Sequence, residues 1–523
     1  MPWLLLVVLL PVPYGVASLF RYLKGPAKQA FSPLDSVYYF GLFAGAVFMV
    51  YLYGRDDSFW HLAFLVKAAL WWFAIGMVHA MSAGLKDKKG GVVPALERIL
   101  RGSRVTSAAE KAASYQGQDY SRNIHIGGVV WPFDKEPQHL LVSGKTGSGK
   151  TQAINALLRT VQTRGLNESA VIADPSGGYL SRFGRASDAV LNPFDRRSVP
   201  WSPFAEIRAE YDCQRIAQAA IPDGNGESRQ WHFYAQSLFS AVLLSLHRQG
   251  KRSVRELLRL VMSGTVRELA EVLQGTSAAP LAEKGNDKML SNTRAIASVY
   301  LAAWQYLPDD GTFSVRDFVK AQRGGWLFLT YRDDQMALLR YLVATWLELA
   351  IVEGLSLSEN PKRRLWFIMD ELDSLGKVTS LRGGLTKLRK YGGCCVCGLQ
   401  TIAQLRDTYG HDEAQTLLSC LSSKLVMAAG DGETAKYFED DLGVQEVERK
   451  EVSRSTSSSG GRDGGGSSSA SESWRREHRA TVLASEITSL PDLAGFLKLP
   501  GDDIVRVALP YVSMPEINPS FVE

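Results

Sequence analysis

Cysteine and histidine are both scarce in this chain of 523 residues, which contains 5 cysteines and 8 histidines. So few cysteines exclude a disulfide scaffold, and we expect the bulk of the chain to lie in a reducing compartment. Neither sign of charge dominates, because 59 lysines and arginines oppose 54 acidic residues and leave a net charge of +5. This balance is compatible with a nucleic-acid partner but does not by itself indicate one.

Three of the five cysteines fall within one short stretch, GGCCVCGLQ, residues 392–400. Adjacent residues of a strand point to opposite faces, so Cys394 and Cys395 cannot readily bind one metal ion. No histidine or fourth cysteine lies at the usual spacing of zinc ligands. We therefore interpret the stretch as a buried parallel strand in which cysteine packs as a small apolar residue.

Three long apolar runs crowd into the first 83 residues, at 3–20, 36–53 and 59–82. Each approaches the roughly 20 residues that a helix needs to cross a bilayer, which predicts a transmembrane region of two or three helices over 1–90. Basic residues follow the first and third runs: Arg21, Lys24, Lys28, Lys86, Lys88 and Lys89. The positive-inside rule then places everything after residue 84 in the cytoplasm. A two-span alternative, with the first run lying in the membrane interface, stays open.

A glycine-rich motif lies between a predicted strand and a predicted helix in HLLVSGKTGSGKTQAINALLRTV, residues 139–161. This order is that of a P-loop, in which backbone N–H groups and a helix N-terminus surround the phosphates of a nucleotide. We expect Lys150 to pair with the β- and γ-phosphates and Thr151 to hold Mg²⁺. The predicted ATP-binding residues are Gly144, Lys145, Thr146, Gly147, Ser148, Gly149, Lys150, Thr151 and Gln152.

A second metal-orienting carboxylate is expected at the end of a neighbouring strand, and RRLWFIMDELDSLGK, residues 363–377, provides it. Residues 365–369 are all apolar and predict a buried parallel strand. Asp370 follows at the carboxyl end of that strand, where it would bind Mg²⁺ through water. Glu371 is placed to polarise the attacking water as a general base.

More than two hundred residues separate Lys150 from Asp370, which is more chain than a compact nucleotide core needs. Residues 209–318 carry helical apolar spacing, and we expect them to form an all-α insertion domain. The stretch GGWLFLTY, residues 324–331, restarts the strand pattern, and a long helix is expected near 334–353. The fold class that follows is α/β.

Two further side chains are candidates for catalysis. Gln400 ends the cysteine-containing strand, where its amide would sense the γ-phosphate or orient water. Arg389 lies at the end of the preceding helix and could reach the nucleotide of a neighbouring subunit as an arginine finger. Lys390 and Arg382 compete for that role, and a solvated basic face is the alternative for all three.

With these motifs in place, the chain resembles the type IV secretion coupling proteins, the TraD/TraG class of conjugative ATPases. VIADPSGGYLSRF (171–183), LNPFDRRSVPWSPFAEI (191–207), DELDSL and GLQTIAQL are similar to that family's motifs. The family's arginine finger falls in an RK-x-G stretch eleven residues before the glutamine, which matches Arg389 and Gln400. The resemblance implies a RecA-like nucleotide-binding domain over 91–208 and 319–523.

The same resemblance implies a function and partners. The protein would be a homohexameric, multi-pass ATPase of the bacterial inner membrane, with its ATPase domain in the cytoplasm. It would move single-stranded DNA with its attached relaxase toward the type IV secretion channel, using ATP and Mg²⁺. An FtsK-like double-stranded DNA translocase is one alternative, and a substrate-receptor adaptor in which nucleotide only controls assembly is another.

Residues 453–473, SRSTSSSGGRDGGGSSSASES, are rich in serine and glycine and too polar to pack against a core. We expect them to form a long disordered loop inside the nucleotide-binding domain. The strand-like stretch DIVRVALPYV, residues 503–512, resumes afterwards, so the loop does not mark a domain boundary.

Overall fold

The computed structural model describes residues 98–115, 119–224, 226–457 and 467–523. The predicted membrane region, 1–90, lies outside the described residues. Among those described, α14 (Asp333–Gly354) is the one helix long and apolar enough to cross a bilayer, and most of its apolar window is buried inside the protein. This helix matches the long helix that the sequence predicts near 334–353.

A ten-stranded, mostly parallel sheet forms the centre of the fold, with the strand order β2-β15-β14-β11-β5-β10-β9-β6-β8-β7. The seven strands from β11 to β7 run parallel, and β14 pairs antiparallel with both β11 and β15. In sheet order the strands are Val105–Ser107, Ile504–Ala508, Ala494–Lys498, Ser423–Met427, Leu140–Ser143, Gly393–Leu399, Leu365–Met369, Ser169–Pro175, Trp326–Tyr331 and Ala189–Leu191.

The central strands are buried on both faces because their residues are apolar at nearly every position. In β9, Leu365, Phe367 and Met369 pack into the core on one face, whereas Trp366 and Ile368 pack into the core on the other. The predicted strands before GKTGSGKT and before DELDSL, and those within GGWLFLTY and GGCCVCGLQ, are all confirmed.

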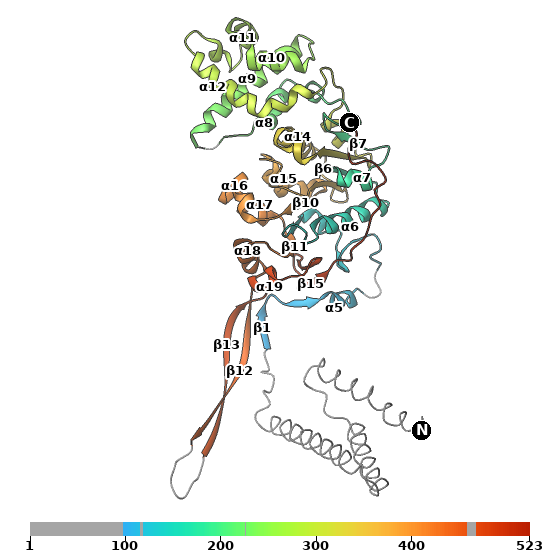
Figure 1. Ribbon diagram of the computed structural model, residues 1–523, viewed down its shortest axis with the longest axis vertical. Helices are drawn as coiled ribbons and strands as arrows, with labels where there is room; N and C mark the ends of the chain where they lie inside the picture. Colours follow the sequence, from blue (N-terminus) through green and yellow to red (C-terminus); the bar gives the residue numbers. More distant parts are fainter. Residues whose placement is uncertain (1–97, 116–118, 225, 458–466) are drawn as a thin grey trace, which may run out of the picture. The chain divides into compact units, whose positions relative to one another are not determined.

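Helices cover both faces of the sheet (Figure 1). The helices packed around the sheet are α5 (Ala108–Ala113), α6 (Lys150–Thr163), α7 (Gly178–Phe183), α14, α15 (Leu381–Lys387), α16 (Ile402–Tyr409), α17 (His411–Cys420), α18 (Gly432–Leu442) and α19 (Ala484–Thr488), with the 3₁₀ turns η1 (Glu136–Gln138) and η6 (Leu388–Tyr391). A short hairpin, β3 (Ile124–Ile126) and β4 (Val129–Trp131), precedes β5. Residues of α6 and α7 pack on the face that contains Trp366, and α14 packs on the other.

Every described element between β7 and β8 is helical, and α8 to α12 group together beyond α14 (Figure 1). They are η2 (Pro203–Glu206), α8 (Asp212–Ala220), η3 (Gly226–Ser228), α9 (Arg229–Arg248), α10 (Val254–Ser263), α11 (Val266–Leu273), η4 (Ala279–Ala282), α12 (Asp287–Leu301), η5 (Ala302–Tyr306) and α13 (Val315–Ala321). Three buried tryptophans, Trp201, Trp304 and Trp346, meet edge to face and join this group to α14.

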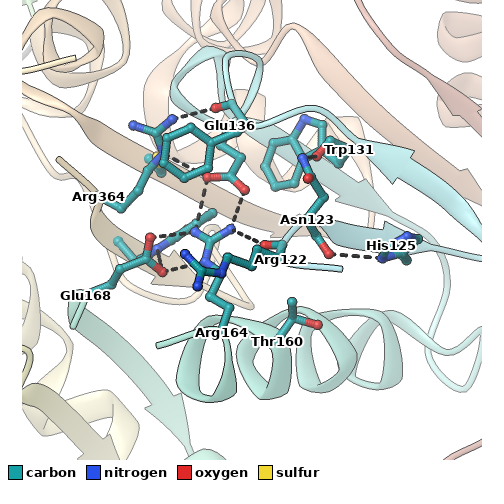
Figure 2. Close-up of polar contacts among 12 residues, drawn as sticks. Arg122, Asn123, His125, Trp131, Glu136, Thr160, Arg164, Glu168 and Arg364 are labelled. Atoms are coloured by element: carbon teal, nitrogen blue, oxygen red, sulfur yellow. Dashed lines mark hydrogen bonds and ion pairs between the residues drawn. The ribbon is translucent and has the colours of Figure 1, made fainter. Parts of the chain in front are cut away.

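A buried ion-pair network ties the C-terminus of α6 to the amino ends of β6 and β9 (Figure 2). Arg164 binds Glu136 and Glu168, each at 2.6 Å, and Arg364 binds the second oxygen of Glu136 at 2.8 Å. The Arg364 guanidinium lies over the ring of Phe133, 3.6 Å from its centroid. All four charges are more than nine-tenths buried and balance in pairs, which fixes the end of α6 against the amino ends of β6 and β9.

The prediction of a disordered loop at 453–473 is wrong for residues 453–457 and 467–473. These residues belong to two long antiparallel strands, β12 (Val444–Ser457) and β13 (Ser467–Ala480), with β1 (Arg98–Gly102) paired to β12. Residues 458–466 lie outside the described residues. Backbone pairing and cross-strand charge pairs stabilise the hairpin where apolar side chains are few. These charge pairs are Glu448–Arg476, Lys450–Glu472 and Glu451–Arg475.

Candidate nucleotide site

The glycine-rich loop lies at the carboxyl ends of the central parallel strands, between β5 and α6. Gly144 N donates to Leu399 O of β10, and Lys145 N donates to Ala428 O beyond β11, so the loop is tied to both strands that flank β5. Gly147 and Gly149 have φ angles of +80° and +109°, in the region that favours glycine. No heavy atom lies within 4 Å of a Cβ built at Gly147, so the loop is open there.

Lys150 is buried beneath this loop at the first position of α6, and its Nζ donates to Gly144 O at 2.7 Å. Burial lowers the pKa of Lys150, and the nearby carboxylates of Asp370, Glu371 and Asp373 oppose that effect. Thr151 and Gln152 follow in the first turn of the same helix.

The structure brings Asp370 to this loop. Its Oδ2 accepts hydrogen bonds from Thr151 Oγ1 at 3.1 Å and from the hydroxyl of Tyr179 at 2.7 Å. A Cβ built on Gly398 would lie 1.7 Å from Asp370 O, so the backbones of β9 and β10 meet here at a distance that only glycine permits. Burial raises the pKa of Asp370, whereas the bonds from Tyr179 and Thr151 lower it.

The other oxygen of this carboxylate, Asp370 Oδ1, is buried and has no hydrogen-bond partner among the described residues. A hydroxyl and a carboxylate side by side form the oxygen donor set that Mg²⁺ prefers, and an open glycine loop with a lysine suits phosphate. The residues present therefore fit a nucleotide phosphate with its divalent cation.

Glu371 and Gln400 lie side by side at the same edge of the sheet. Gln400 Nε2 donates to Glu371 Oε1 at 3.3 Å, and Thr146 Oγ1 of the loop donates to Gln400 Oε1 at 3.2 Å. Glu371 is half-buried, and burial, followed by the charges of Asp370 and Asp373, raises its pKa. A carboxylate of raised pKa that faces the phosphate loop can accept a proton from water.

Arg389 does not join this constellation within its own chain. It is exposed in η6, immediately before the amino end of β10, whereas Gln400 follows the carboxyl end of that strand. A strand of this length spans about 20 Å. Arg389 therefore lies at the amino ends of the strands, away from the glycine-rich loop at their carboxyl ends. Lys390 and Arg382 are also exposed.

Sequence reasoning missed two residues of the site, Tyr179 and Asp174. Asp174, at the end of β6, accepts backbone hydrogen bonds from Tyr179 and Leu180 and so holds the first turn of α7. Burial raises the pKa of Asp174 to about 7, although these two bonds lower it. The signals in the sequence were a carboxylate at a strand end followed by a glycine pair and an aromatic residue, within a stretch that resembles the family's motifs.

Comparisons with known proteins identify relatives of this chain. Residues 123–510 match the family described as the type IV secretion-system coupling protein DNA-binding domain. The coupling protein TraD of Escherichia coli K12 is 30% identical over 410 residues, which cover 76% of this chain and 56% of TraD. A conjugal transfer protein TraG of Escherichia coli is 26% identical over 57% of this chain and 55% of TraG. The chain thus spans about half the length of the curated relatives it matches.

Solved structures of one coupling protein share the fold. The unbound monoclinic form of the bacterial conjugative coupling protein TrwBdeltaN70 is 36% identical, with a TM-score of 0.74 over 82% of this chain and 97% of that one. TrwB in complex with ADP and Mg²⁺ is 36% identical, with a TM-score of 0.73 over 83% and 99%. A complex of TrwB with the non-hydrolysable analogue ADPNP matches equally well. The chain therefore belongs to the family of type IV secretion-system coupling proteins.

Proposed function

We propose that this protein is a membrane-anchored, hexameric ATP hydrolase of conjugation. It couples relaxase-bound single-stranded DNA to a type IV secretion channel at the bacterial inner membrane and drives transfer by ATP hydrolysis. One observation carries the proposal. Asp370 meets Lys150 and Thr151 at one glycine-rich loop, although more than two hundred residues separate it from them in the sequence.

Within this proposal each side chain has a chemical task. Lys150 and the loop N–H groups bind the phosphates, and Thr151 and Asp370 hold Mg²⁺, which would neutralise charge between the phosphates. Glu371 accepts the proton of the attacking water, and Gln400 orients that water beside Glu371. TrwB forms complexes with ADP and Mg²⁺ and with ADPNP, which supports nucleotide as the ligand.

The remaining parts of the proposal rest on the family and on sequence. The matching family is a DNA-binding domain of type IV secretion-system coupling proteins, which supports DNA and a secretion channel as partners. The apolar runs within 1–90 support a membrane anchor. The place of Arg389, far from its own loop, favours a site completed by a neighbouring copy, as in a ring-shaped hexamer.

The test is the ATPase rate of the full chain in detergent, with and without single-stranded DNA, across protein concentration. A motor whose site is shared between copies should show cooperative dependence on concentration and stimulation by single-stranded DNA. No hydrolysis at any concentration would contradict the proposal. Stronger stimulation by double-stranded DNA would favour the FtsK-like alternative.

The variant Glu371→Gln separates the motor from the adaptor alternative. Its amide keeps the size and hydrogen bonding of the carboxylate but cannot take a proton. We expect unchanged nucleotide binding and loss of both hydrolysis and conjugative transfer in a mating assay. Transfer at the wild-type frequency by a variant that binds but does not hydrolyse ATP would show that nucleotide controls assembly alone.

A further inference from the structure

Tyr179 makes a buried contact with the carboxylate that the proposed function assigns to Mg²⁺. Its hydroxyl donates to Asp370 Oδ2 at 2.7 Å, the shorter of the two hydrogen bonds to that oxygen. Only 2% of its surface is exposed, and Asp370 is 5% exposed. The two donors occupy Oδ2 and leave Oδ1 of the same group without a partner among the described residues.

Several contacts hold Tyr179 in this position. Asp174 accepts from Tyr179 N at 2.9 Å and from Leu180 N at 2.7 Å, which fixes the first turn of α7 to the end of β6. Gly177 begins the helix with a φ angle of +66°, and a Cβ built there would lie 2.2 Å from Ser520 O. Only glycine therefore fits at the turn that directs Tyr179 toward Asp370.

Residues 516–523 pass over the outer side of α7, and Figure 1 shows this end of the chain running past α7 to β7. Ile517 N and Asn518 N both donate to Ser181 O, and Arg197 donates to Pro519 O at 2.7 Å. The NPFDRRS stretch, which the nucleotide chemistry does not use, therefore binds the segment that covers α7. The helix is held from inside by Asp174 and from outside by this segment.

We propose that Tyr179 is a positioning residue for the metal site: its hydroxyl orients Asp370 so that Oδ1 is presented to the cation. The inference rests on the proposed function, because it assumes that Asp370 binds Mg²⁺. Partners that orient a metal-binding carboxylate typically contribute a factor of about 10 to 100 in metal affinity. A purely structural hydroxyl would instead contribute to stability and leave the affinity for the cation unchanged.

The experiment compares Tyr179→Phe with Tyr409→Phe in the full chain. Tyr409 is also buried, but its hydroxyl accepts a hydrogen bond from Val378 N and is not bonded to Asp370. The readout is the binding of a fluorescent ADP analogue as Mg²⁺ is added. We measure the Mg²⁺ concentration at which half of the gain in affinity is reached, and the affinity of the analogue in EDTA. We expect about a tenfold increase in that concentration for Tyr179→Phe, with unchanged affinity in EDTA. Tyr409→Phe should stay within about twofold of wild type.

The outcomes are distinct. If both variants lower the melting temperature while the half-saturating Mg²⁺ concentration of Tyr179→Phe equals that of wild type, the hydroxyl is structural and the inference fails alone. If wild type itself shows no Mg²⁺-dependent binding, the proposed function fails and takes the inference with it. Should Tyr179→Phe not fold, Asp174→Asn, which loosens the same turn, must raise the half-saturating concentration for the inference to stand.

Discussion

At the scale of single residues, Gln400 connects two parts of the site. It bridges Thr146 of the phosphate loop and Glu371, the candidate base, through one side-chain amide. Because both bonds fix the amide plane, the residue can transmit the state of the loop to the base. These two hydrogen bonds distinguish Gln400 from a glutamine that only covers the surface.

We predict that Gln400→Ala lowers kcat for ATP hydrolysis by about a hundredfold, because a positioned hydrogen-bonding group beside the reacting water is lost. KM for ATP should change little, since no phosphate contact is removed. Steady-state kinetics measure both. The control is Gln404→Ala, one turn along in α16, where the glutamine is exposed. Equal kcat values for the two variants would show that Gln400 has no part in ATP hydrolysis.

His139 predicts a pH dependence of stability. It is buried before β5, with Nε2 bonded to Leu385 O and Nδ1 accepting from Cys395 N. Burial lowers its pKa to about 4, helped by the charge of Arg389, from an ordinary value of 6.5. The unfolded chain therefore takes up the proton first as the pH falls. The stability contribution is full above pH 6.5 and is lost progressively toward pH 4.

By pH 5 this single group should cost the folded state about 2 kcal/mol relative to pH 7. The measurement is the denaturant midpoint at both pH values for wild type and His139→Gln, which should show a smaller decline between them. His125→Gln, at an exposed histidine in β3, should keep the wild-type decline. An unchanged decline in His139→Gln would mean that other groups account for the acid sensitivity.

Residue-scale prediction from sequence is possible where a motif has an obligatory context. The strand, glycine loop and helix around Lys150, and the apolar strand before Asp370, form as predicted, and the structure joins Thr151 to Asp370 by a hydrogen bond. Tyr179 escaped because its contact depends on where a six-residue helix begins after β6. That start is set by Asp174 and by a segment more than three hundred residues away, neither of which leaves a periodic pattern.

At the scale of elements, the buried ion-pair network at the C-terminus of α6 can be tested for its part in fixing this helix, which begins at the glycine-rich loop. Arg164→Met keeps the length of the side chain but leaves Glu136 and Glu168 buried with one cation between them. We expect a loss of about 3–5 kcal/mol, because an uncompensated buried carboxylate is costly. The measurement is the shift in thermal unfolding.

The matched control for Arg164→Met is Arg248→Met. Arg248 pairs with Glu210 at 2.6 Å, but both side chains are 57% exposed. Solvent screens such a pair, so we expect a loss of less than about 1 kcal/mol. If the two variants melted at the same temperature, the buried network would not be what secures α6.

Elements differ in how far the sequence predicts them. Buried parallel strands such as β9 and β10 are legible because both faces are covered and the apolar run is continuous. For residues 453–473 the sequence predicts a loop, because serine and glycine indicate no core, although 453–457 and 467–473 belong to the β12–β13 hairpin. Its pairing depends on charges that meet only across the two strands, such as Glu448 and Arg476, and composition does not record which residues face each other.

At the scale of the whole molecule, the position of Arg389 bears on assembly. Arg389 lies at the amino ends of the strands, away from the glycine-rich loop of its own chain, so under the proposed function it would serve the nucleotide of a neighbour in a closed ring. The spacing between Arg389 and Gln400 in the sequence cannot distinguish these two cases, because it fixes a strand between them and not the chain that completes the site.

Mixing two inactive variants tests this arrangement directly. Lys150→Ala abolishes phosphate binding in its own site, and Arg389→Ala would withhold the cation from the site of a neighbour. In a random mixture, a complete site forms where an Arg389→Ala copy, which keeps Lys150, lies beside a Lys150→Ala copy, which supplies Arg389. This arrangement occurs at about one quarter of the sites. We therefore expect ATPase activity to reappear on mixing. Lys150→Ala mixed with Glu371→Gln should stay inactive, because both groups belong to the same chain's site. Activity restored in neither mixture would exclude Arg389 as a group shared between copies.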